Sequence, residues 1–192
     1  TRRRLLEAAV ACFERHGYEA TTTAMIAERA GVAVGSVYNH FVDKRAMILE
    51  LLDETHRELA QQVVAPLDPA RWRGRVDPRD LTRRLIDAVF RVQGLRPGIQ
   101  RILWARYFSD PGFEPPFDAF RDRLREAIVR FLEAVDEQGL CRPGLDREQA
   151  SVVILNAVQW NAAQAYLQGQ DDARRLAAAA RATAELVARY VF

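Results

Sequence analysis

Four polar side chains that can form hydrogen bonds lie between residues 36 and 40 of this 192-residue chain. Ser36, Tyr38, Asn39 and His40 carry hydroxyl, phenol, carboxamide and imidazole groups, and no carboxylate lies among them. Such groups bind phosphate oxygens and read base edges in the major groove of DNA. A carboxylate would repel the phosphate backbone. The chemistry that this stretch predicts is therefore DNA binding.

The residues before this stretch predict two short helices that would present it. Ile26 and Ala27 share one face of a first helix, and Gly31 follows it at a position that favours a left-handed backbone. A second helix running to Phe41 would turn Val37 and Phe41 inward. This is the layout of a helix-turn-helix, whose second helix lies in the major groove. An ordinary corner between two helices of an all-α protein has the same pattern.

Cations flank the predicted motif, although the formal net charge of the chain is only +2. Lys44 opens the next helix, where a cation is unfavourable for the helix dipole unless an anion such as phosphate lies opposite. Arg2, Arg3 and Arg4 form the densest cationic run, which is either an arm that contacts DNA or a solvated helix start. With so small a net charge, DNA binding has to come from the local arrangement of side chains.

The segment from Gly17 to Leu49 resembles the DNA-binding domain of the TetR family of one-component transcriptional regulators. The resemblance covers about a quarter of the chain and rests on Thr21-Thr22, Ile26-Ala27, Ala30-Gly31-Val32, Gly35, Val37-Tyr38, His40-Phe41 and Lys44. It implies a DNA-binding domain over residues 1–47 and an effector-binding and dimerisation domain over residues 48–192. It also implies double-stranded DNA with a palindromic operator sequence as the partner.

The resemblance and the side-chain chemistry together predict which residues contact DNA. Thr22, Tyr38, His40 and Lys44 are expected at phosphates, and Gly35, Ser36 and Asn39 at bases. The full predicted set is Thr22, Thr23, Ala33, Val34, Gly35, Ser36, Tyr38, Asn39, His40 and Lys44.

Three positions depart from the family pattern. Met25 replaces an acidic residue that often completes the cap of the first helix, Ala33 replaces a capping serine or threonine, and Val34 replaces a basic residue. Replacement of a capping side chain costs about 1 kcal/mol. We therefore expect that the operator sequence of this protein cannot be inferred from the operator of a relative.

The remainder of the chain also reads as helical, with no strand-like alternation. We predict an all-α fold of about nine helices, in which a three-helix helix-turn-helix head precedes a helical-bundle body. A solvated loop is expected over residues 66–78. Helices are expected over residues 3–16, 44–64, 79–92, 118–137, 146–169 and 172–190, with one more after Pro97.

The last two predicted helices suggest how the protein assembles. The helix over residues 146–169 carries almost no charge beyond its first turn, so both of its faces should be covered. We predict a homodimer through a four-helix bundle, whose two-fold symmetry matches a palindrome. A helix buried wholly within one monomer is the alternative. The candidate interface residues are Val153, Trp160, Ala177, Ala180 and Ala184.

The middle helices are rich in aromatic residues and hold the candidate sensor. By the family resemblance, a small apolar or aromatic effector bound there would release a repressor from its operator. The alternative is a filled core in a DNA-binding dimer that a protein partner regulates. The candidate pocket residues are Phe90, Leu103, Trp104, Tyr107, Phe108 and Phe120.

Catalysis finds little support in the sequence. The three histidines are scattered, and no metal-ligand pair, glycine-rich phosphate loop or G-x-S-x-G motif is present. We expect no enzyme, no cofactor and no metal; an all-helical hydrolase or small-molecule carrier is the remote alternative.

Two distant cysteines fit a reducing cytoplasm. The uncharged run over residues 149–170 is broken by asparagines and glutamines, so no membrane span is expected.

Overall fold

The computed structural model describes residues 1–167 and 173–192, apart from the side chains of residues 166 and 167, and these ranges contain helices and no strands. The all-α prediction is confirmed, with ten α-helices where about nine were expected. They are α1 (Arg2–Ala20), α2 (Thr23–Ala30), α3 (Val34–Tyr38), α4 (Lys44–Leu59), α5 (Pro69–Trp72), α6 (Pro78–Gly94), α7 (Pro97–Ser109), α8 (Glu114–Asp136), α9 (Arg147–Leu167) and α10 (Ala173–Val191). A π-helical segment, η1 (Ala60–Val64), continues α4, and two 3-10 turns, η2 (Ala65–Leu67) and η3 (Pro111–Phe113), precede α5 and α8.

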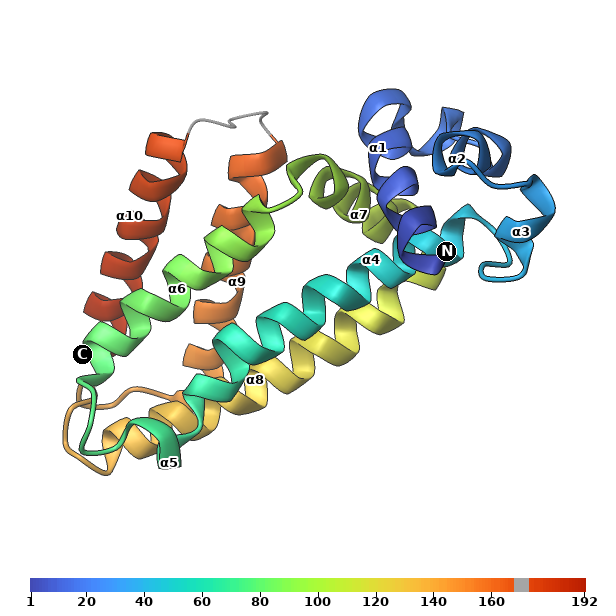
Figure 1. The fold of residues 1–192 in the computed structure, drawn as a ribbon. Helices are drawn as coiled ribbons and strands as arrows, with labels where there is room; N and C mark the ends of the chain where they lie inside the picture. Colours follow the sequence, from blue (N-terminus) through green and yellow to red (C-terminus); the bar gives the residue numbers. More distant parts are fainter. Residues whose placement is uncertain (168–172) are drawn as a thin grey trace.

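The first three helices form a head at one end of the molecule (Figure 1). Their apolar faces meet the start of α4 in a shared core that includes Leu5, Ile26 and Val37, each without solvent exposure. Ile99 and Leu103 of α7 also belong to this core. The head is therefore closed on one side by a helix that follows much later in the chain.

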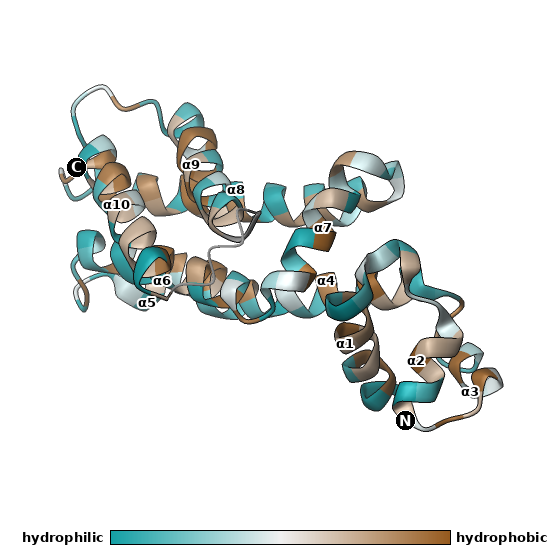
Figure 2. Cartoon of the chain, turned by 90° about the horizontal axis from the view of Figure 1, so that it is seen from above, coloured by the Kyte–Doolittle hydropathy of each residue, from teal (hydrophilic) through white to brown (hydrophobic). Residues whose placement is uncertain are grey.

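The remaining helices form the body, which extends away from the head, and α7 and the start of α4 lie against α1 (Figures 1 and 2). Helix α10 packs against α6 and α9, and α9 packs against α8. Helices α4 and α8 meet at His56, whose ring lies 4.3 Å from that of Phe120. No helix in the described ranges is long and apolar enough to cross a membrane.

The structure corrects the prediction of a solvated loop over residues 66–78. This segment contains η2 and the short helix α5, and Leu67 and Trp72 are buried within it. The indole N–H of Trp72 donates to the carbonyl oxygen of Leu67 at 3.2 Å, and its ring lies 5.2 Å from that of Phe131. These apolar anchors attach the segment to the body core, while Arg71, Arg73 and Arg75 remain exposed to solvent as the prediction expected. The predicted end of a helix at residue 169 and the start of another at 172 lie outside the described residues.

Candidate functional site

The turn between α2 and α3 has the geometry that the sequence predicts. The hydroxyl of Thr22 accepts a hydrogen bond from the backbone N–H of Met25 at 3.2 Å and caps α2. Gly31 ends this helix with φ of 64°, in the left-handed region that favours glycine. The N–H of Val32 then reaches back to the carbonyl oxygen of Ala27 at 3.0 Å. These contacts fix the angle at which α3 leaves α2.

Helix α3 is shorter than predicted, because it ends at Tyr38 instead of Phe41. Its first turn has no side-chain cap at Ala33. The chain must reverse quickly after Tyr38, since Asp43 already caps α4 by accepting from the N–H of Ala46 at 2.7 Å. Phe41 is still buried in the head core. Asn39 and His40 therefore belong to the turn after the helix.

The predicted DNA-contacting residues form one surface around α3. The hydroxyl oxygen of Tyr38 lies 3.1 Å from that of Thr23, which joins the start of α2 to α3. Tyr38 is 55% exposed and Val34 is 43% exposed, so both aromatic and apolar contact area is available to a ligand. Thr22, Ala33, Gly35, Asn39 and His40 are exposed, and Thr23 and Ser36 are half-buried.

Gly35 has no structural role that the described part of the chain accounts for. It lies in α3 without a positive φ, and a Cβ atom added there would meet no atom within 4 Å. Glycine inside a helix costs up to about 1 kcal/mol relative to alanine. A residue that is unfavourable for the helix and unnecessary for packing fits a surface that another molecule approaches closely.

Lys44 is committed to the head itself. Its ammonium donates to the carbonyl oxygens of Tyr18, Glu19 and Thr21 at 2.7, 2.9 and 3.1 Å. An ammonium has three N–H groups, so these bonds use all of them. Neutral carbonyl oxygens at the C-terminal end of α1 thus take the place of the anion that was expected opposite this cation, and we do not assign Lys44 to the DNA-contacting residues.

The N-terminal arginines are part of α1 and form no extended arm. Arg2 pairs with Glu50 at 2.5 Å, and its guanidinium lies 4.9 Å from the ring centroid of Phe41. Arg3 pairs with Glu7 at 3.0 Å, and Arg4 donates to a carbonyl oxygen of α2. Helix α1 begins at Arg2, as the helix-start interpretation expected.

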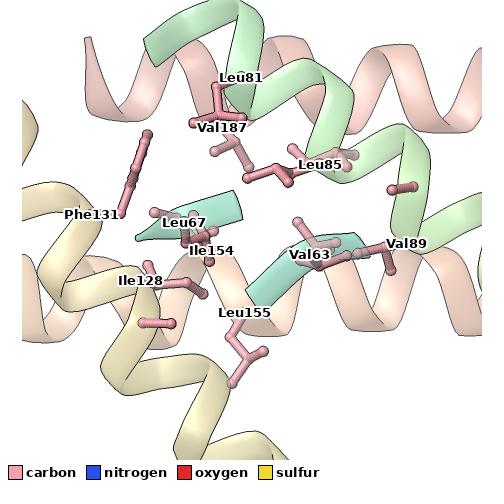
Figure 3. Packing of buried hydrophobic residues seen from close by; sticks show 14 of the residues in the cluster. Val63, Leu67, Leu81, Leu85, Val89, Ile128, Phe131, Ile154, Leu155 and Val187 are labelled. Carbon is pink, nitrogen blue, oxygen red and sulfur yellow. The ribbon is translucent and has the colours of Figure 1, made fainter. Parts of the chain in front are cut away.

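The body holds a partly open apolar cavity of about 120 Å³, which is lined by α4, α6, α7, α8, α9 and α10 and by η1 and η2. Figure 3 shows side chains that form part of its wall and that come from η1, η2, α6, α8, α9 and α10. Val63, Leu85, Ile128, Ile154 and Val187 are among the lining residues. The body therefore contains an apolar cavity, but most of its lining residues differ from the aromatic residues on which the prediction was based.

Two of the six candidate pocket residues, Trp104 and Phe120, line this cavity. Phe90 is buried in the surrounding core, and Leu103 belongs to the head core. Tyr107 and Phe108 line a neighbouring hollow of about 250 Å³, which shares Trp104 and Phe117 with the cavity. Phe108 is 67% exposed, because its position on α7 points away from both cores.

Sequence reasoning missed the polar residues that line the cavity. They are Thr55, His56, Thr82, Gln93, Gln100, Arg121 and Gln159. Burial lowers the pKa of His56 to about 4, with a smaller contribution from Arg123, so its imidazole is neutral near pH 7. Helical spacing gave a usable signal, since Thr82, Leu85, Val89 and Gln93 follow one another on the apolar face of α6.

The candidate dimer residues fall on two different faces. Val153 and Trp160 of α9 are 47% and 48% exposed, and Ala177 of α10 is exposed too. Ala180 and Ala184 are each 3% exposed and lie in the body core. The small side chains that were expected to meet a second copy therefore allow α10 to approach α6 instead. Helix α9 is half covered by its own chain and half open.

The sequence of the head is similar to that of a known protein family. Residues 5–51 match the model of the bacterial regulatory proteins of the tetR family. The transcriptional regulator TtgR of Pseudomonas putida is 37% identical over 105 residues, which are 53% of this chain and 47% of TtgR. The chain thus spans about half the length of that relative.

Two further similarities cover more of the chain. The transcriptional repressor KstR2 of Mycobacterium tuberculosis is 28% identical over 154 residues, which are 74% of this chain and 70% of KstR2. The transcriptional regulator FadR of Bacillus subtilis, solved in complex with stearoyl-CoA, superposes over 100% of both chains with a TM-score of 0.77 and 16% identity. The fold of the described residues is therefore shared from the head to the body.

Proposed function

Because this chain belongs to the tetR family of bacterial regulatory proteins, we propose that it is a sequence-specific DNA-binding transcriptional regulator. The observation that carries the proposal is the exposed surface around α3. This surface contains hydrogen-bonding side chains and Gly35. A side chain at position 35 would clash with no described residue, so the fold of the described residues does not require glycine there. We assign phosphate contacts to Thr22, Tyr38 and His40, and base contacts to Ser36 and Asn39.

The regulator acts as a homodimer on a palindromic operator. The open face of α9, with Val153 and Trp160, supplies the contact between copies, together with exposed residues of α10 such as Leu186, which is 56% exposed. Exposed apolar side chains on adjacent helices are typical of an interface between subunits. Two-fold symmetry then presents two copies of α3 to two half-sites.

The regulator is a repressor, and a small lipophilic effector in the body cavity releases it from DNA. KstR2 is a repressor, and FadR was solved with stearoyl-CoA, a molecule with a long apolar chain. The cavity of the present chain is apolar and adjoins the head. The head and body residue ranges 1–47 and 48–192 remain our proposed domain limits, with α4 crossing between them.

Two helices can carry the signal from the cavity to the head. On α7, Gln100 and Trp104 line the cavity, and Ile99 and Leu103 lie in the head core. On α4, Leu52 belongs to both groups. An effector that prefers one position of these helices would shift the head with a coupling of about 1–3 kcal/mol.

Selection of bound sequences from random duplex DNA, followed by anisotropy titrations at several salt concentrations, tests this function. We expect a palindromic motif that binds far more tightly than scrambled DNA. Sequence-blind binding, or none, would contradict the regulator. If the motif binds but no compound of a broad apolar library stabilises the protein against heat, the effector part of the proposal is wrong and a filled core under a protein partner's control is favoured.

A further inference from the structure

The body cavity extends along much of α6. Thr82 and Gln93 lie at opposite ends of the cavity-lining face of α6, and Leu85, Ile86 and Val89 line the cavity between them. Eleven residues of α-helix rise by about 16 Å. A cavity that is lined along that length of helix fits an extended chain better than a compact ring system.

The described residues that line the cavity supply little net charge for an ionised ligand. They include no carboxylate, and His56 is neutral near pH 7 because burial holds its pKa at about 4. Arg121 is the cation among them, and its guanidinium lies 3.0 Å from the carboxylate of Asp118, where its side chain is 40% exposed. An ionised group deep in the cavity would lose its hydration without gaining a free counter-charge.

Among the described residues of the cavity wall, Gln93 holds a fully buried polar atom that lacks a hydrogen-bond partner. The side-chain oxygen of Gln93 is buried and accepts no hydrogen bond from the residues that the structure describes. Gln93 as a whole is only 7% exposed. A buried carbonyl oxygen without a donor is unfavourable, and most such groups in folded proteins are satisfied.

Other polar groups in the wall are already engaged. The hydroxyl of Thr82 donates to the carbonyl oxygen of Pro78 at 2.8 Å, and the amide of Gln100 donates to the hydroxyl of Thr55 at 3.5 Å. Gln93, at the opposite end of the same helical face from Thr82, therefore holds a buried acceptor that no described residue uses, whereas the hydroxyl of Thr82 is already hydrogen-bonded.

We propose that the effector is an elongated, uncharged lipophile whose hydroxyl or N–H group donates a hydrogen bond to the side-chain oxygen of Gln93. The apolar remainder of the molecule extends along α6 toward Thr82. This assignment rests on the proposed function of the body as a sensor, and it specifies the chemical class that the sensor selects.

Three probes of matched length test the assignment. Dodecanol carries a donor, undecyl methyl ether has the same number of heavy atoms without a donor, and dodecanoate is an anion. Binding to the full chain is followed by tryptophan fluorescence, since Trp104 lines the cavity, and by thermal stabilisation. We expect dodecanol to bind about tenfold more tightly than the ether, as one additional hydrogen bond predicts. Dodecanoate should bind more weakly than dodecanol.

Two variants connect the preference to Gln93. Gln93→Met keeps the length of the side chain and removes the acceptor, so it should bind dodecanol and the ether within about twofold of each other. Thr82→Val is the matched control at the other end of the cavity, and it should keep the tenfold preference.

The possible outcomes separate the inference from the function on which it rests. Equal binding of dodecanol and the ether to the unmodified protein, tighter binding of dodecanoate, or a preference that survives Gln93→Met would each overturn the inference while leaving an apolar sensor in place. If none of the three probes binds or stabilises a protein that still binds its operator, the inference is wrong, and the sensor function fails with it only if the broad apolar library also gives no stabilisation.

Discussion

The ammonium nitrogen of Lys44 lies 4.6 Å from the ring centroid of Tyr18 and 2.7 Å from the carbonyl oxygen of the same residue. The guanidinium of Arg106 lies 4.9 Å from the same ring centroid, and it pairs with Glu19 at 2.7 Å. Cations from α4 and α7 thus meet the end of α1. This junction connects the head to α4 and α7, which are two of the helices that line the body cavity.

Substitution of Lys44 should affect stability before it affects DNA contacts. Lys44→Met removes three charge-assisted hydrogen bonds from the half-buried junction, so we expect a loss of about 1–3 kcal/mol in the free energy of unfolding, measured by urea denaturation. The salt dependence of operator binding should keep its slope, because the ammonium neutralises no phosphate. A slope reduced by about one phosphate contact would instead return Lys44 to the DNA-contacting set.

Gly35 should separate stability from DNA binding. Gly35→Ala places a methyl group in open space within α3, so the head should melt at the same or a higher temperature, with a gain of up to about 1 kcal/mol. Affinity for the operator should nevertheless fall, because the methyl group lies where DNA approaches. Unchanged affinity in an anisotropy titration would show that the close approach does not occur at this position.

Asn39 and Tyr38 should have different effects on specificity. Asn39→Ala should relax the preference at one base pair of each half-site, by about 1–3 kcal/mol, in a series of operators with single substitutions. Tyr38→Ala serves as the comparison and should weaken binding to all operators about equally. A uniform loss from Asn39→Ala would remove it from the base-contacting residues.

Acid should destabilise the body through His56. Its pKa is lowered from 6.5 to about 4 in the folded protein, so the unfolded chain binds more protons between these two values. The contribution to stability is complete above pH 6.5 and declines as the pH falls toward 4, by roughly 3 kcal/mol at most. Thermal unfolding at several pH values should show this decline, and His56→Phe should remove that part of it. An identical pH profile for the variant would assign the effect to other groups.

The exposed face of α9 should control assembly. Val153→Glu or Trp160→Glu places charge on that face, so the protein should sediment as a monomer and bind a palindromic operator much more weakly than before. Leu140→Glu introduces the same charge at another exposed apolar residue, which is 41% exposed between α8 and α9, and should leave the mass unchanged. Dimers in all three variants would place the interface elsewhere.

The sequence by itself determined the helical fold and the layout of the head. Periodic apolar residues predict helices because a 3.6-residue repeat places them on one face. The left-handed turn at Gly31 and the capping of α2 by Thr22 are local, so the residues on either side were sufficient to predict them. The exposed residues around α3 were predicted from their types for the same reason.

The tertiary structure decided which neighbouring helix each side chain contacts. Lys44 faces carbonyl groups from α1, more than twenty positions earlier in the chain, and no local pattern encodes that meeting. Phe108 and Trp104 are four residues apart on α7, yet Phe108 is exposed and Trp104 is buried. Trp104 lines both the cavity and the neighbouring hollow. Ala180 and Ala184 were equally suited to a second copy or to α6. Side-chain type sets what a residue can contact, whereas the packing of distant helices sets what it does contact.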